Sequence, residues 1–279
     1  MKKINRRSFL AAAGLTAAAL ALTACGGSAS STASSTASSA ASSEAASTSA
    51  AAAELTTVEA GKLTMATNAT FPPYEMTTDS GEFEGIDIDT AKAIADKLGL
   101  ELQIDDMDFD AALLSVQQGK ADIAMAGVTV TDERKAVMDF SDSYATGIQS
   151  IIVPEGSDIA SPDDLAGKKI GTQRGTTGYI YCSDDFGEDS VVAYDSGLTA
   201  VQALNNGQVD AVVIDNAPAT EYVAANPGLK VLDTSYAEED YAIGMAKGSA
   251  LEDAVNKALE ELKADGTLQA IADKYINAN

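Results

Sequence analysis

The chain has 279 residues, with 18 Lys and Arg against 42 Asp and Glu, and its formal net charge is −24 at pH 7. This acidity argues against a nucleic-acid partner, because binding of phosphates requires clustered cationic side chains. The sequence contains no His, which excludes Ser-His-Asp and Cys-His catalysis and any His-ligated zinc site. The length suits one large or two medium domains.

The N-terminus has the features of an export signal. Residues 1–24 contain no acidic residue, and an apolar run at residues 9–22 is too short to span a bilayer. The adjacent Arg6 and Arg7 suit either the positively charged start of an ordinary signal peptide or a twin-arginine signal. Residues 22–25, Leu-Thr-Ala-Cys, resemble a bacterial lipobox. This resemblance implies that residues 1–24 are a lipoprotein signal peptide and that the thiol of Cys25 is lipidated.

Residues 25–60 are predicted to form a disordered tether. Residues 28–53 are almost entirely Ser, Ala and Thr, with Glu44 as their only charged residue, and such a segment has little apolar surface to bury. Cys182 is the only other thiol. With Cys25 lipidated, no intrachain disulfide is expected, and Cys182 is predicted to be a half-buried core residue.

From residue 62 onward, strand and helix patterns alternate. In chain order we predict a strand at 62–67, a helix at 89–98 that stops at Gly99, a strand at 101–105, a helix from its N-cap Asp108 to Gly119, and a buried strand at 123–126. A similar series is predicted over residues 169–213. Two helices close the chain, the first opened by a capping box of Ser249 and Glu252. This alternation predicts an α/β fold with mostly parallel sheets.

A weak internal repeat relates residues 116–124 to residues 204–212. In both segments a predicted helix ends at a Gly and a strand begins shortly afterwards. Gly127 and Asp215 occupy equivalent positions at the carboxyl ends of the two strands. Open parallel sheets bind ligands at that edge, so the repeat indicates two related lobes facing one cleft. A chance match of a common helix-to-strand turn is the alternative.

Two charged residues near predicted strand ends each allow two interpretations. Thr131 is placed to cap a short helix with Arg134 in its first turn, where a cation opposes the helix dipole unless Asp132 and Glu133 compensate it. Alternatively, Arg134 points into the cleft and binds a carboxylate through two hydrogen bonds. Asp215 is either only a helix N-cap or also a partner for an ammonium group.

Two further motifs follow predicted strands. The Gly-rich segment 171–178 matches neither the dinucleotide-binding pattern nor a P-loop, so nucleotide binding is not expected, although a small anion at the helix start is compatible with it. Residues 71–74, Phe-Pro-Pro-Tyr, supply either an aromatic wall of the cleft or ordinary core.

In this order, the motifs resemble those of the polar amino-acid-binding proteins of ABC importers, the family 3 solute-binding proteins. The resemblance covers the chain from about residue 61 to its end. Its most specific segments are residues 66–74, 85–89, 126–134, 139–141, 171–178 and 207–215. It implies a two-lobe periplasmic-binding-protein-like (type II) α/β fold, in which two strands form the hinge. Lobe 1 is then expected at residues 61–144 and 248–279, lobe 2 at 149–243, and the hinge at 144–148 and 241–247.

The resemblance also implies roles for individual residues. Arg134 and the backbone N–H groups of Thr129 and Thr177 are expected to bind the ligand carboxylate. Asp215, the Gly127 carbonyl and the Thr129 hydroxyl are expected to bind the ammonium group. The residues expected to contact the ligand side chain are Asn68, Phe71, Ile86 and Gln173. Many relatives carry an aromatic residue at the position of Ile86, and the neutral Asn68 and Gln173 favour a polar, uncharged ligand side chain.

The implied function is capture of an amino acid by closure of the two lobes, followed by delivery to an ABC permease and its ATPase subunit. The resemblance further implies a monomer without cofactor or metal, held at the outer face of the cytoplasmic membrane by Cys25. An exported enzyme of the cyclohexadienyl-dehydratase type on the same fold is the alternative, although an acidic cleft suits its dianionic substrates poorly.

Overall fold

The computed structural model describes residues 55–276. The predicted signal peptide, Cys25 and most of the predicted tether therefore lie outside the described residues. The last tether residues, 55–60, contact the folded body: Leu55 packs against its core, and the Val58 N–H donates to Asp122 Oδ1 at 2.8 Å. The folded part of the chain thus begins a few residues earlier than predicted.

Lobe 1 is built on a five-stranded sheet in the order β5-β1-β6-β14-β7. Its strands are β1 (Lys62–Thr67), β5 (Glu101–Asp106), β6 (Ile123–Ala124), β7 (Met138–Phe140) and β14 (Gly244–Ala246). β1 pairs in parallel with β5 and β6, whereas β14 is antiparallel to β6 and β7. The parallel part matches the predicted alternation, and β14 returns from the far end of the sequence to complete the sheet.

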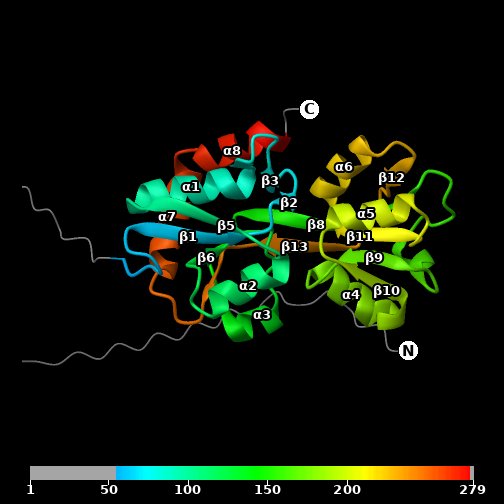
Figure 1. The fold of residues 1–279 in the computed structure, drawn as a ribbon, viewed down its shortest axis with the longest axis horizontal. Helices are drawn as coiled ribbons and strands as arrows, with labels where there is room; N and C mark the ends of the chain where they lie inside the picture. The colour runs from blue at the N-terminus through cyan, green and yellow to red at the C-terminus, as the bar shows by residue number, and fades with distance from the viewer. Residues whose placement is uncertain (1–54, 277–279) are drawn as a thin grey trace, which may run out of the picture. The chain divides into compact units, whose positions relative to one another are not determined.

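Helices cover both faces of this sheet (Figure 1). One face carries α1 (Ile86–Leu98), α7 (Glu252–Ala264) and α8 (Thr267–Ile276), and the other carries α2 (Phe109–Gln117) and α3 (Asp132–Val137). Separate apolar clusters fill the two sides, one centred on Leu63, Ile94 and Leu259 and the other on Phe109 and Val116. A small antiparallel sheet of β2 (Thr70–Phe71), β3 (Glu75–Thr77) and β4 (Phe83–Glu84) adjoins α1.

Lobe 2 is built on a second sheet, in the order β10-β9-β11-β8-β12, with β13 also paired to β8. Its strands are β8 (Ala145–Pro154), β9 (Ile170–Gln173), β10 (Val191–Tyr194), β11 (Ala211–Asp215), β12 (Leu229–Val231) and β13 (Ala237–Tyr241). The helices of this lobe are α4 (Thr177–Phe186), α5 (Gly197–Asn205) and α6 (Asn216–Ala225), with short 3-10 turns η1 (Pro162–Leu165) and η2 (Glu188–Ser190). β9, β10 and β11 are parallel, as predicted.

Two antiparallel strands connect the lobes. β8 pairs with β13 in a register that runs from Ala145 opposite Tyr241 to Gln149 opposite Ala237. The first crossing agrees with the expected hinge at 144–148. The second lies at 237–241 rather than 241–247, because Gly244–Ala246 is already part of the lobe 1 sheet as β14.

Several local expectations differ from the structure. α1 begins at Ile86 instead of residue 89, since the Gly85 carbonyl accepts the Asp89 N–H and closes the first turn. Asp108 stands at the N-cap of α2 but makes no capping hydrogen bond. The predicted capping box of α7 does not form, because Ser249 Oγ accepts the Leu251 N–H and the helix starts only at Glu252.

Cys182 is fully buried in the core of lobe 2, deeper than the half-buried position predicted for it. Burial raises the pKa of its thiol to about 12, so the group behaves as a small apolar side chain. Within residues 55–276, no helix has both the length and the apolar character needed to cross a membrane.

Candidate binding cleft

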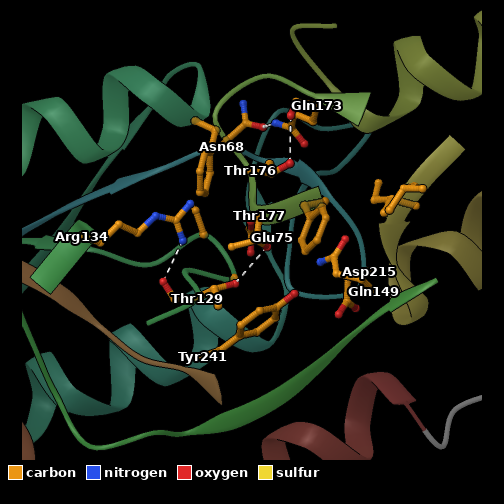
Figure 2. A pocket seen from close by; sticks show the side chains of 16 residues that line it. Asn68, Glu75, Thr129, Arg134, Gln149, Gln173, Thr176, Thr177, Asp215 and Tyr241 are labelled. Carbon is orange, nitrogen blue, oxygen red and sulfur yellow. Dashed lines mark hydrogen bonds between the residues drawn. The ribbon is translucent and has the colours of Figure 1, made fainter. Parts of the chain in front are cut away.

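A pocket lies between the two lobes and is lined by both of them (Figure 2). All but one of the residues predicted to bind the ligand line it: Asn68, Phe71, Gly127, Thr129, Arg134, Gln173, Thr177 and Asp215. Ile86, which was also expected to contact the ligand, does not line this pocket. It opens α1 and is buried in the core of lobe 1 beside Tyr74 and Tyr144.

Arg134 lies where a helix start and the cleft meet. Thr131 caps α3 by accepting the Arg134 N–H at 3.2 Å, as the sequence predicts. The guanidinium donates to the Thr129 carbonyl at 2.7 Å and, across the cleft, to the Gly175 carbonyl at 3.1 Å. It also lies 5.3 Å from the centre of the Phe109 ring. Asp132 and Glu133 are exposed, whereas Arg134 is buried. These two acidic residues therefore do not account for the position of the Arg134 guanidinium.

The electrostatics of Arg134 favour an anionic partner. Burial lowers the pKa of its guanidinium, although the nearby negative charge of Glu239 opposes this shift. The hydrogen bonds of its guanidinium to Thr129 and Gly175 end on carbonyl oxygens, which carry only partial charge. A carboxylate entering the pocket therefore gains a fully charged donor with planar, two-pronged geometry.

Asp215 is a helix N-cap that also lines the pocket. It ends β11 and caps α6 by accepting the Ala217 N–H at 3.0 Å, and its other oxygen accepts the Ile148 N–H at 2.7 Å. It also lines the pocket while only 2% exposed. Burial raises the pKa of this carboxyl group to about 6, because desolvation disfavours the ionised form. A cationic group in the pocket would relieve that cost.

Neutral amides close the far end of the pocket. Gln173 of lobe 2 donates through Nε2 to Asn68 Oδ1 of lobe 1 at 2.9 Å. Asn68 in turn donates to the Met107 carbonyl at 2.9 Å. This end of the pocket therefore offers hydrogen-bonding groups without formal charge.

Gly127 brings backbone close to two aromatic rings. Its φ is +56°, and a Cβ atom here would lie 3.0 Å from Phe71 Cε1 and 3.2 Å from Tyr241 Cε2. A larger residue is therefore disfavoured both by this left-handed conformation and by the ring contacts. The Gly127 N–H donates to Asp87 Oδ2 at 3.0 Å.

Sequence reasoning missed an acidic pair beneath Gly127. Glu75, which lines the pocket, and Asp87 are both fully buried. Burial and the Asp87 charge hold the pKa of Glu75 well above its usual range, and burial raises the pKa of Asp87 to about 6. Two interacting carboxyl groups that are both buried ionise together less readily than either does alone. Glu75 lies on β3 and Asp87 in the first turn of α1, and no local sequence pattern marks either as a buried residue.

Other lining residues were also not predicted. They are Phe109, Ala126, Gln149, Thr176, Val213, Ile214 and Tyr241. Gln149 and Tyr241 belong to the crossing strands, so predicting a hinge could have indicated that its residues also form a wall of the cleft.

The lobes touch each other around the pocket. Besides the bonds of Gln173 and Arg134, the hydroxyls of Thr129 and Thr177 lie 3.5 Å apart across the cleft, and the Tyr222 hydroxyl donates to the Thr70 carbonyl. Arg134 and Asp215, a buried cation and a buried carboxylate on opposite walls of the pocket, match the two charges of a zwitterion. Among residues 55–276, no group of three or more Asp, Glu or Cys side chains is placed to hold a metal ion.

Comparison with known proteins gives consistent results. The profile of the bacterial extracellular solute-binding proteins, family 3, matches residues 63–278. A probable histidine-binding protein of Neisseria gonorrhoeae is 33% identical over 281 residues, covering 98% of this chain and 96% of that protein.

Solved structures show the same similarity. The arginine-, lysine-, histidine-binding protein ArtJ of Geobacillus stearothermophilus is 34% identical, with a TM-score of 0.75 over 78% of this chain and 96% of that chain. An ancestral arginine-binding protein solved with glutamine is 43% identical, with a TM-score of 0.73 over 77% of this chain and 98% of that chain.

Proposed function

The chain belongs to the bacterial extracellular solute-binding proteins, family 3, and we propose that it captures an amino acid between its lobes for an ABC importer. The observation that carries this proposal is the separation of two buried charges. Arg134 lies on lobe 1 and Asp215 on lobe 2, and both line the same pocket. A free amino acid carries the complementary carboxylate and ammonium groups.

The ligand is oriented by these charges. Its carboxylate binds Arg134 together with the backbone N–H groups of Thr129 and Thr177. Its ammonium group binds Asp215, the Gly127 carbonyl and the Thr129 hydroxyl. Phe71 packs on the side chain, whose end meets Asn68 and Gln173. Because those two amides are neutral and bonded to each other, the proposed ligand side chain is polar and uncharged.

Closure follows from the same arrangement. Only the closed form brings both protein charges to the ligand, so binding shifts the population toward that form. The bond from Arg134 to the Gly175 carbonyl of lobe 2 supports this coupling, since the carboxylate-binding residue itself touches both lobes. The closed, loaded form is the one presented to the permease.

The proposed cellular setting rests on the N-terminal sequence. Cleavage before Cys25 and lipidation of its thiol would anchor the protein at the outer face of the cytoplasmic membrane, with residues 25–54 as a tether. The permease and its ATPase subunit are separate chains, and the binding protein acts as a monomer.

A thermal-shift screen tests the ligand proposal. The protein is unfolded and refolded to remove bound ligand, then heated with each of the twenty amino acids, ornithine, citrulline and cystine. A ligand at 100 times its Kd adds about 2.7 kcal/mol of stability. We expect stabilisation by amino acids with polar, uncharged side chains. Stabilisation only by arginine, lysine or ornithine contradicts the side-chain assignment, and no stabilisation by any amino acid contradicts the function.

A further inference from the structure

A buried glutamate on a crossing strand contacts both walls of the cleft without lining the pocket itself. Glu239 lies on β13 and is 6% exposed. Its Oε2 atom accepts hydrogen bonds from the Thr129 hydroxyl at 3.1 Å, the Thr177 hydroxyl at 2.9 Å and Gln149 Nε2 at 3.0 Å. One carboxylate oxygen therefore collects donors from lobe 1, lobe 2 and the other crossing strand.

Backbone pairing fixes this arrangement. The Val130 N–H donates to the Asp240 carbonyl, and the Ala242 N–H donates to the Val128 carbonyl, both at 3.1 Å. These bonds hold the loop containing Thr129 against the end of β13. The neighbours of Glu239 along the strand, Glu238 and Asp240, are exposed, so the strand alternation turns Glu239 alone of the three toward the cleft.

The contacts decide which way the two hydroxyl groups point. A threonine hydroxyl has one proton to donate and two lone pairs, whereas an ionised carboxylate only accepts. With their protons committed to Glu239, Thr129 and Thr177 present only lone pairs in other directions. Both residues line the pocket, so a ligand meets acceptors at these two oxygens.

We propose that Glu239 is a positioning residue that fixes the Thr129 and Thr177 hydroxyls as acceptors and thereby makes the cleft select an α-ammonium group over an α-hydroxyl group. This inference rests on the proposed function, because it concerns the amino group of the same ligand. An ammonium group brings several N–H donors for Asp215, the Gly127 carbonyl and Thr129. A 2-hydroxy acid brings a single donor, and its oxygen lone pairs face those of the threonines.

Charge acts in the same direction. The Glu239 carboxylate disfavours ionisation of Asp215 and favours the charged form of Arg134. A cationic group placed among these residues is therefore stabilised by two carboxylates rather than one. A neutral hydroxyl group at the same place is not stabilised by the charges of these two carboxylates.

The test compares amino acids with their 2-hydroxy analogues by titration calorimetry. The pairs are L-glutamine, L-histidine and L-arginine, each with the 2-hydroxy acid of the same side chain. Glu239→Met keeps the length of the side chain and removes the acceptor. We expect the ratio of hydroxy-acid Kd to amino-acid Kd to fall by about tenfold or more, since hydrogen bonds to charged groups have that weight. Glu238→Met, the same change at an exposed position of β13, leaves the ratio at its wild-type value.

A second variant covers the case in which Glu239→Met does not fold, as judged by circular dichroism. Thr129→Val deletes the hydroxyl that Glu239 positions, and the ratio falls there as well. Where Glu239→Met does fold, adding it to Thr129→Val has a smaller effect on the ratio than adding it to the wild type. An unchanged ratio in the folded Glu239→Met protein, or in Thr129→Val, overturns the inference. A wild-type protein that binds no amino acid of the thermal screen but does bind other solutes overturns the proposed function instead.

Discussion

Replacing Asp215 with Asn removes the charge proposed to bind the ligand ammonium group while preserving the shape of the side chain. In the wild type, the two carboxylate oxygens accept the Ile148 N–H at 2.7 Å and the Ala217 N–H at 3.0 Å. A hydrogen bond to a charged group contributes about 1.5–3 kcal/mol. The expected loss of affinity is therefore about 10- to 150-fold.

The stability of the ligand-free protein is expected to change much less than the affinity. Asn has one acceptor oxygen, so one of the two backbone N–H groups loses its partner at a cost of about 1–3 kcal/mol. However, burial raises the pKa of Asp215 from 3.8 to about 6. Keeping it ionised at pH 7 therefore costs about 3 kcal/mol, and Asn removes that cost. The two effects offset each other, and the melting temperature stays close to that of the wild type.

The pH dependence provides a separate check. Because the pKa of Asp215 is raised in the folded protein, ionisation of this group lowers stability as the pH rises from about 4 through 6. The bound ammonium group favours the ionised form, so the wild-type affinity decreases as the pH falls below about 6. Asp87 has a pKa near the same value. The Asp215→Asn variant separates the two, since its affinity should lose the part of this dependence that Asp215 causes.

The assay is titration calorimetry at pH 5, 6, 7 and 8 with an amino acid found in the thermal screen, together with thermal melts of the ligand-free proteins. Asp210→Asn is the matched control, because Asp210 is an exposed carboxylate just before β11 whose oxygen accepts the Lys169 N–H. Its affinity and pH profile should follow the wild type. If Asp215→Asn binds as tightly as the wild type at pH 7, Asp215 does not bind the ammonium group and the assignment is wrong.

Three further substitutions test the framework around the cleft. Thr131→Ala removes the cap of α3 and should cost about 1 kcal/mol, seen as a fall in melting temperature of about 2–4 °C. Gly175→Ala places a Cβ atom 1.6 Å from Asp110 Oδ1 across the cleft at a φ of +72°. The left-handed backbone should cost about 1–2 kcal/mol of stability. The clash across the cleft should weaken ligand binding in calorimetry, and an additional Asp110→Ala change should recover part of the affinity but not the stability. Gly147→Ala places a Cβ atom 2.4 Å from the ring of Tyr241 and should lower the melting temperature, and an unchanged melt would show that the crossing strands absorb the clash.

The sequence predicted best the features that depend on neighbouring residues. Thr131 caps α3 with Arg134 in the first turn, and Asp215 caps α6 at the end of β11, because capping needs only a suitable side chain two or three residues before an N–H group. The same local logic failed for Ser249, whose hydroxyl accepts a nearer N–H group than a capping box requires.

Features that depend on distant parts of the chain were not predicted. Ile86 was assigned to the ligand by its place in a motif, but the start of α1 turns it into the core. Glu239 and Glu75 look like ordinary acidic residues in an acidic chain, and no local pattern shows that one binds two threonines across the cleft or that the other is fully buried. The role of Glu239 arises from the pairing of β13 with β8, in which Glu239 lies opposite Gly147.

The strand order of lobe 1 also constrains the order in which the two lobes fold. Its sheet runs β5-β1-β6-β14-β7, so β14 lies between β6 and β7 although it follows all of lobe 2 in the sequence. During synthesis the N-terminal part of a chain appears first, and contiguous units fold as they are completed. The strands of lobe 2 all lie within residues 145–241 and are available before residue 244 appears. The second lobe is therefore expected to complete its sheet first, and the first lobe to finish only when the returning strand fills the gap between β6 and β7.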